Sequence, residues 1–152
     1  MNKVWTYIIS VPLGDIELEQ LLKAGKTFAE HWTAHEHKLN ASFDIYKKRI
    51  VVVKVNEDAA SASGCSIDKL IRFIKLTETT FGIELLNRFL IAYKNGENVE
   101  VVHSTKIKEL LNQHIISENT IVYNTSVSNE SEFKQWEQAL KDTWLNKYLI
   151  LS

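Results

Sequence analysis

The stretch that decides the fold is Ser61-Ala62-Ser63-Gly64-Cys65-Ser66-Ile67-Asp68, where a strand gives way to a helix. The residues before it, 49–55, begin with Arg49 and continue as an apolar run that only Lys54 interrupts. Such a run is typical of a central strand. The residues after it, 67–81, repeat apolar side chains at helical spacing and stop at Gly82, a good helix terminator. The small polar residues in between predict a loop that leads directly into the start of the helix.

On either side of this stretch, periodic segments follow the order strand, helix, strand, strand, helix, strand. The expected strands are residues 4–11, 41–46, 50–55 and 88–93, and the expected helices are 15–35 and 67–81. This is the βαββαβ order of ferredoxin-like domains. We therefore expect an α+β fold with a mainly antiparallel sheet, both helices on one face, and Cys65 within one turn of a helix start.

The C-terminal third is expected to add a hairpin strand and helices to this core. Asn95-Gly96 predicts a tight hairpin that leads into a further strand at 99–103. A short helix at 106–114 and a strand at 120–127 come next, and residues 128–132 form a polar turn. A last helix is predicted from large side chains at helical spacing, which are Phe133, Trp136, Leu140, Trp144 and Tyr148.

Length, charge and cysteine content limit the classes of protein to which this chain can belong. The 152 residues fit one domain, 1–152, that is long enough to bury a core. The net charge is −1 without a basic block, and no apolar run is long enough to span a membrane. A single cysteine cannot form an internal disulfide, which favours a reducing compartment. We expect a cytoplasmic protein that binds neither nucleic acid nor a membrane.

Cys65 is the candidate reactive residue. It lies at the expected helix start, where unpaired N–H groups and the helix dipole favour a thiolate or a bound anion. Asp68, in the first helical turn, is the second candidate catalytic residue. The candidate ligand-binding residues share this turn or the helix face that follows it, and they are Ser63, Gly64, Ser66 and Arg72. These residue types would surround a small anionic group.

The same turn also has a purely structural interpretation. In this interpretation, Ser66 caps the helix. The negative charge of Asp68 interacts favourably with the positive end of the helix dipole, and Asp68 forms an ion pair with Arg72, four residues later. Cys65 then packs as a small apolar side chain. Both interpretations predict the same local fold and differ only in whether the thiol is accessible and reactive.

Three histidines lie near the end of the first expected helix. His31 and His35 are four residues apart and would share a helix face, and His37 follows. No second cysteine and no acidic residue at metal-ligand spacing accompanies them. We expect neither a metal site nor a cofactor, with histidines that interact with the helix dipole instead; metal binding is the alternative.

Several runs spread over nearly the whole chain carry a family resemblance. They are Trp32-Thr-Ala-His35, Ala41-Ser42, Ser63-Gly-Cys-Ser-Ile-Asp68, Arg72-Phe-Ile74, Thr120-Ile-Val-Tyr-Asn124, Trp136 and Trp144. Together they resemble a family of short bacterial proteins often labelled "ABC transporter ATPase", a label that implies nucleotide hydrolysis. However, Gly25-Lys26-Thr27 matches only the end of a P-loop, and Gln20 stands where the required glycine would be. We therefore expect no binding or hydrolysis of ATP.

Two functions are consistent with these observations. In the first, the chain is a small cytoplasmic protein that binds a small anionic ligand, or performs thiol chemistry, at the turn from Ser63 to Asp68. In the second, it is a non-catalytic interaction domain that self-associates as a homodimer, and the turn is structural. Whether the chain is an enzyme depends on which of the two applies.

Overall fold

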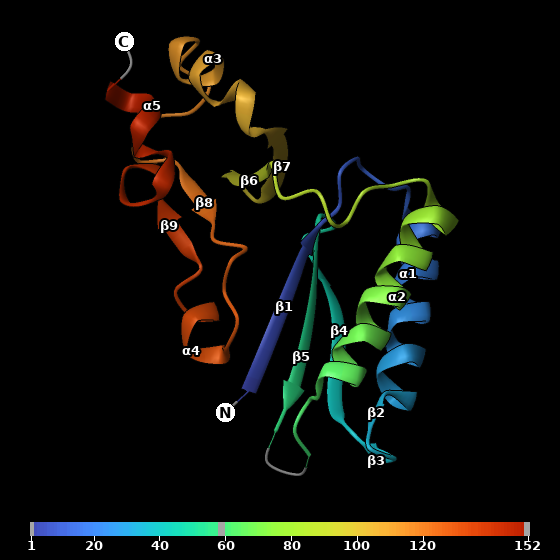
Figure 1. Cartoon of the computed structure of the whole chain (residues 1–152). Helices are drawn as coiled ribbons and strands as arrows, with labels where there is room; N and C mark the ends of the chain where they lie inside the picture. The colour runs from blue at the N-terminus through green and yellow to red at the C-terminus, as the bar shows by residue number, and fades with distance from the viewer. Residues whose placement is uncertain (1, 58–59, 151–152) are drawn as a thin grey trace.

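A three-stranded antiparallel sheet forms the centre of the N-terminal half. Its strands β1 (Asn2–Ile8), β5 (Ile50–Asn56) and β4 (Asn40–Tyr46) lie in the order β1-β5-β4. Helices α1 (Asp15–His31) and α2 (Gly64–Phe81) cover one face of this sheet (Figure 1). The computed structural model describes residues 2–57 and 60–150, so part of the predicted loop at 56–64 lies outside the described residues.

The central strand β5 is apolar along its length because both of its faces are buried. Val51 and Val53 pack toward the helices, in a core that also contains Leu70 of α2. Ile50 and Val52 point the other way, into a second core. This confirms the strand predicted at 50–55 and explains why it shows no alternation of polar and apolar residues.

A second antiparallel sheet packs on the other face of the first. Its four strands lie in the order β7-β6-β8-β9, which are Asn98–His103, Leu90–Asn95, Ile121–Tyr123 and Glu137–Ala139. Ala92 and Tyr123 point into the core between the two sheets. Ile91 and Tyr93 point to the outer side, where they pack with residues of α3 (Ile107–Asn112), α5 (Lys147–Ile150) and the turns between Leu140 and Asn146. The layers are therefore helices, sheet, sheet and short helices.

The α+β class with antiparallel sheets is confirmed, whereas the ferredoxin-like sheet is not. The fourth strand of the expected core is present as β6, but it pairs with β7 and β8 in the second sheet. The hairpin predicted at Asn95-Gly96 forms, with Gly96 at φ 60°, and occupies one edge of β6, while β8 takes the other edge, where β1 would pair in a ferredoxin-like sheet. As a consequence, no strand of the described residues pairs along the full outer edge of β1.

The predicted C-terminal helix is wrong. Its residues form a single helical turn α4 (Glu130–Phe133), then strand β9 and two short 3-10 turns before α5. Trp136 is buried between the two sheets, whereas Leu140 is buried on the outer side of the second sheet. The large side chains at helical spacing thus belong to two different cores, and a single helix cannot face both.

Three other predicted elements are shorter than expected. Helix α1 ends at His31 because His35 and Glu36, at φ 50° and 67°, form the turn of a small hairpin, β2 (Thr33–Ala34) and β3 (His37–Lys38). The strand expected at 120–127 is limited to β8, and the helix expected at 106–114 is limited to α3. Within the part of the chain that the structure describes, no helix has the length and apolar character needed to cross a membrane.

Candidate functional site

The turn before α2 is closed by its own serines. Ser63 is the N-cap residue of α2, and its hydroxyl accepts a hydrogen bond from the Ser66 backbone N–H at 3.3 Å. The Ser66 hydroxyl accepts from the Ser63 backbone N–H at 2.7 Å and donates to the Ser63 carbonyl at 2.8 Å. This reciprocal pair is a capping box, in which both hydroxyls serve the helix start.

Ser66 is also a packing residue. It is fully buried, and its carbonyl oxygen accepts a hydrogen bond of 2.8 Å from the indole Nε1 of Trp32. The Trp32 ring in turn packs against Phe28 and Trp5. The contacts of Ser63 and Ser66 therefore agree with the structural interpretation of this turn.

The other predicted residues of the turn face solvent. Cys65 is the second residue of α2, which confirms its predicted place within one turn of a helix start, and it is exposed rather than packed. Gly64, Asp68 and Arg72 are exposed as well. The predicted pairing of Asp68 with Arg72 is wrong, since neither has an ion pair among the described residues. The turn brings these side chains onto one exposed surface at the start of α2.

The histidines are separated by the end of α1. His31 lies in the last turn of the helix, with its Nδ1 at 2.9 Å from the Thr27 carbonyl. His35 lies in the following turn and His37 in β3, so the expected shared helix face of His31 and His35 does not form. Among residues 2–57 and 60–150, no group of three or more potential ligands is placed to hold a metal ion.

The outer edge of β1 is partly open, and this edge is the better candidate site. The Val4 N–H bonds the Ser128 carbonyl at 3.1 Å, and the Ser10 N–H bonds the Glu84 carbonyl at 3.1 Å. Alternate residues of a strand direct their N–H groups to the same side, so Thr6 and Ile8 face this edge too. Neither makes a backbone hydrogen bond on this side to another described residue. The edge is thus held at both ends and unpaired in the middle.

Two cavities of about 160 Å³ and 560 Å³ lie along this unpaired segment. We call them together the β1-edge groove. Their shared walls come from three separate parts of the chain, β1, the connection from α2 to β6, and the connection from β8 to α4, and consist of Thr6, Tyr7, Leu86, Arg88, Thr125 and Ser126. The groove therefore lies at the seam between the two halves of the protein.

The charge around the β1-edge groove is positive. Arg88 lines both cavities and Lys3 lines the larger one, while no aspartate or glutamate lines either. Lys3 has an ion pair with Glu57 at 3.9 Å. The exposed Arg88 has neither an ion pair nor a hydrogen bond among the described residues, so its five donors are available. An unpaired arginine at a cavity wall without carboxylates favours an anionic ligand.

Tyr7 adds a polar group next to Arg88. Its side chain is 8% exposed, and its hydroxyl is buried without a hydrogen-bond partner in the described structure. Burial raises the pKa of Tyr7 to about 12, and the positive charge of Arg88 acts in the opposite direction, which shows that the two groups are neighbours. A buried hydroxyl without a partner lowers the stability of the folded protein, because its desolvation is not offset by a hydrogen bond.

We predict that Tyr7→Phe leaves the protein at least as stable at pH 8, and by up to about 1 kcal/mol more stable, because no hydrogen bond is lost. Wild type should lose about 2–3 kcal/mol between pH 10 and pH 12, since its unfolded state ionises Tyr7 first. The variant should lose correspondingly less over that range. Urea unfolding at both pH values measures this, and a loss above 1 kcal/mol at pH 8 would show that the hydroxyl is bonded.

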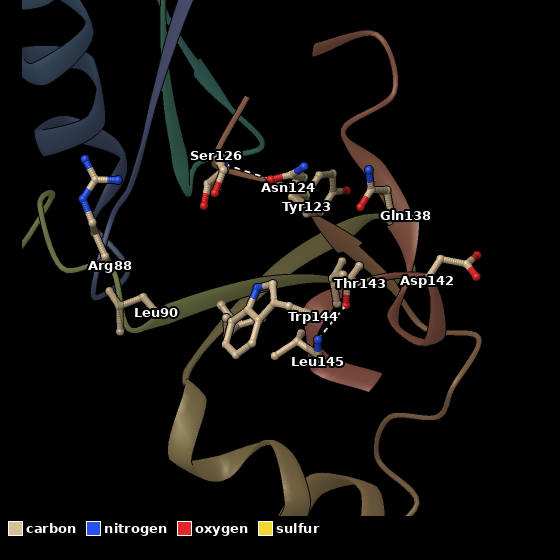
Figure 2. Close-up of a pocket in the computed structure, with 13 residues that line it drawn as sticks. Arg88, Leu90, Tyr123, Asn124, Ser126, Gln138, Asp142, Thr143, Trp144 and Leu145 are labelled. Atoms are coloured by element: carbon tan, nitrogen blue, oxygen red, sulfur yellow. Dashed lines mark hydrogen bonds between the residues drawn. The ribbon is translucent and has the colours of Figure 1, made fainter. Parts of the chain in front are cut away.

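A third cavity of about 260 Å³ adjoins the groove through Arg88, Thr125 and Ser126. It extends across the second sheet toward Trp144 and Asp142 (Figure 2). Figure 2 shows the Arg88 side chain directed away from Trp144, at the opposite end of this cavity.

The sequence pattern missed Arg88 because it counted this residue as the start of a strand. In the structure β6 begins at Leu90, which leaves Arg88 in the connection that crosses the seam. The only signal in the sequence was weak, because Arg88 directly precedes the apolar run from Phe89 to Ala92 but has Glu84 four residues before it as a possible partner. Thr125 and Ser126 carry no comparable signal.

Comparison of the chain with family models, with curated proteins and with solved structures finds no match. The resemblance to the family labelled "ABC transporter ATPase" therefore stays a prediction.

Proposed function

We propose that this protein is a binding protein for a small carboxylate ligand, which it takes into the β1-edge groove with Arg88 as its anchor. The observation that supports this most is the place of Arg88, unpaired among the described residues, at the point where all three cavities meet. The chain contains two other arginines. Arg49 is buried, and its Nη2 donates to the Ile9 carbonyl at 3.0 Å, while Arg72 lies exposed on α2.

The donors favour a carboxylate over a phosphate group. One guanidinium binds one carboxylate with two parallel hydrogen bonds. The unpaired N–H groups of Thr6 and Ile8 are the further donors along the edge, and Thr125 and Ser126 contribute hydroxyls on the opposite wall. A phosphate dianion commonly needs more positive charge or a helix N-terminus, and the groove has neither at Arg88.

The walls favour binding over catalysis. The β1-edge groove is lined by no cysteine, histidine, aspartate or glutamate, so its serine and threonine hydroxyls have none of the usual general bases beside them to activate them. The small anionic ligand expected from the sequence is thus retained, but at a different place in the fold from the turn at Ser63 and Cys65. Thiol chemistry at Cys65 and self-association stay predictions.

The proposal predicts that benzoate binds with millimolar affinity and that Arg88→Ala weakens this binding at least about tenfold. Arg72→Ala is the matched control, because it removes an exposed arginine from the other candidate site and should leave the affinity unchanged. Isothermal titration calorimetry with benzoate, acetate and inorganic phosphate measures all three proteins. Arg88→Lys should retain part of the affinity, since it keeps the charge but loses the two-pronged geometry.

Two results would contradict the proposal. Benzoate binding that is lost in Arg72→Ala and kept in Arg88→Ala would place the anion at the start of α2. Equal affinity of wild type and both variants would mean that no arginine anchors the ligand.

A further inference from the structure

We infer that the physiological ligand is the free C-terminal end of an extended peptide, which pairs with the open edge of β1 and places its α-carboxylate on Arg88. This inference rests on the proposed function and adds the class of ligand. It comes from two features of the groove that a simple carboxylate leaves unused, which are the unpaired C=O groups of β1 and the apolar wall beside them.

The first feature is the backbone itself. Thr6 and Ile8 direct both an N–H and a C=O to the open edge, and neither group has a backbone partner there in the described structure. An extended peptide offers N–H and C=O groups in the complementary order, so it can continue the antiparallel ladder of β1, β5 and β4. The place it would take is that of the fourth strand in a ferredoxin-like sheet, which β6 leaves vacant.

The second feature is the wall on the helix side of the edge. The larger cavity is lined there by Trp5, Ile67, Ile71 and Leu86, all of which are half-buried. Side chains of an added strand point alternately to the two faces of the sheet. A peptide side chain that points to the helix side would meet this apolar wall, while the C-terminal carboxylate of the peptide would lie at Arg88.

The charges exclude several other peptide ends. No carboxylate lines the groove, so an N-terminal ammonium group or a basic side chain would have no counterion there. A peptide that ends in an apolar residue with a free carboxylate matches the groove at each of its three parts, the open backbone, the apolar wall and the arginine.

The test compares acetylated alanyl-alanyl-leucine as free acid, as C-terminal amide, and as free acid with the leucine nitrogen methylated. Calorimetry should show that the free acid binds more tightly than acetate. The amide should bind about tenfold more weakly than the free acid, and N-methylation should lower the affinity of the free acid about fivefold. Arg88→Ala should reduce the affinity of the free acid to that of the amide.

Two variants of β1 test the edge from the protein side. Thr6→Pro removes the outward N–H and blocks the edge without removing a bond to β5, whereas Thr6→Val removes only the hydroxyl that donates to the Thr125 carbonyl at 3.1 Å. Peptide affinity should fall further in Thr6→Pro than in Thr6→Val, because only the proline also removes the N–H that pairs with the peptide. If Thr6→Pro does not fold, the methylated peptide still decides the same point.

The outcomes separate the two proposals. Binding of benzoate that depends on Arg88, together with equal affinities of acetate and the two free-acid peptides, would overturn the peptide inference and leave the carboxylate site in place. Absence of any binding that depends on Arg88 would overturn both. A wild-type dimer that Arg88→Ala dissociates in sedimentation, with no effect of peptide, would show a second copy of the chain in the groove and would also overturn the inference.

Discussion

Replacing Trp136 with alanine is expected to lower the free energy of unfolding by about 3–5 kcal/mol, the usual cost of truncating a fully packed aromatic side chain. Trp136 is 6% exposed and lies between the two sheets. Its ring centroid is 4.9 Å from Tyr123, 5.0 Å from Tyr46 and 4.6 Å from Phe133, so the truncation would open a cavity among three other rings. Urea unfolding followed by circular dichroism measures the change.

Trp144→Ala is the matched control for this prediction. Trp144 is 57% exposed and contacts Lys147, whose Nζ lies 5.0 Å from the ring centroid. Its loss should cost less than about 1 kcal/mol. Equal losses of unfolding free energy in the two variants would contradict the placement of Trp136 between the sheets. They would favour the single amphipathic helix that the sequence predicts at the C-terminus.

Replacing Gly25 with valine is expected to destabilise the protein by about 3 kcal/mol, although glycine is normally unfavourable inside a helix. A Cβ atom at Gly25 would overlap the ring of Phe43 in β4, which is buried beneath α1. Gly25 therefore permits close contact between helix and sheet. This also accounts for Gly25-Lys26-Thr27, which lies in the middle of α1 and not in a phosphate-binding loop.

The exposed neighbour Ala24 provides the control, since Ala24→Val changes helix propensity without entering the core. It should cost about 0.5 kcal/mol. A stabilised Gly25→Ala variant would show that α1 does not rest on Phe43 as described.

The N-terminal half could be predicted from the sequence because its patterns are local and long. The run at 50–55, the seventeen-residue helix α1 and the helix that begins after Ser63 each contain enough periodic residues to define an element. The Asn95-Gly96 hairpin could be predicted for the same reason, since its turn chemistry is contained in two residues.

The C-terminal half could not be predicted, because two cores divide its apolar residues. Trp136 and Leu140 are four residues apart, as in a helix, yet they flank the strand β9 and reach opposite sides of the second sheet. The partner of β6 is likewise a tertiary choice between β1 and β8 that no local pattern contains. The β1-edge groove exists only because of that choice, so Arg88 could not be identified as a site residue.

The most direct measurement of the central claim is a two-dimensional ¹H–¹⁵N NMR titration of the labelled protein with benzoate. A carboxylate in the β1-edge groove should shift the backbone signals of Thr6, Ile8, Thr125 and Ser126 and the side-chain Nε signal of Arg88. The signals of Gly64 and Cys65, at the start of α2, should stay in place. Shifts confined to Gly64 and Cys65, or no saturable shift at any of these positions, would contradict the account.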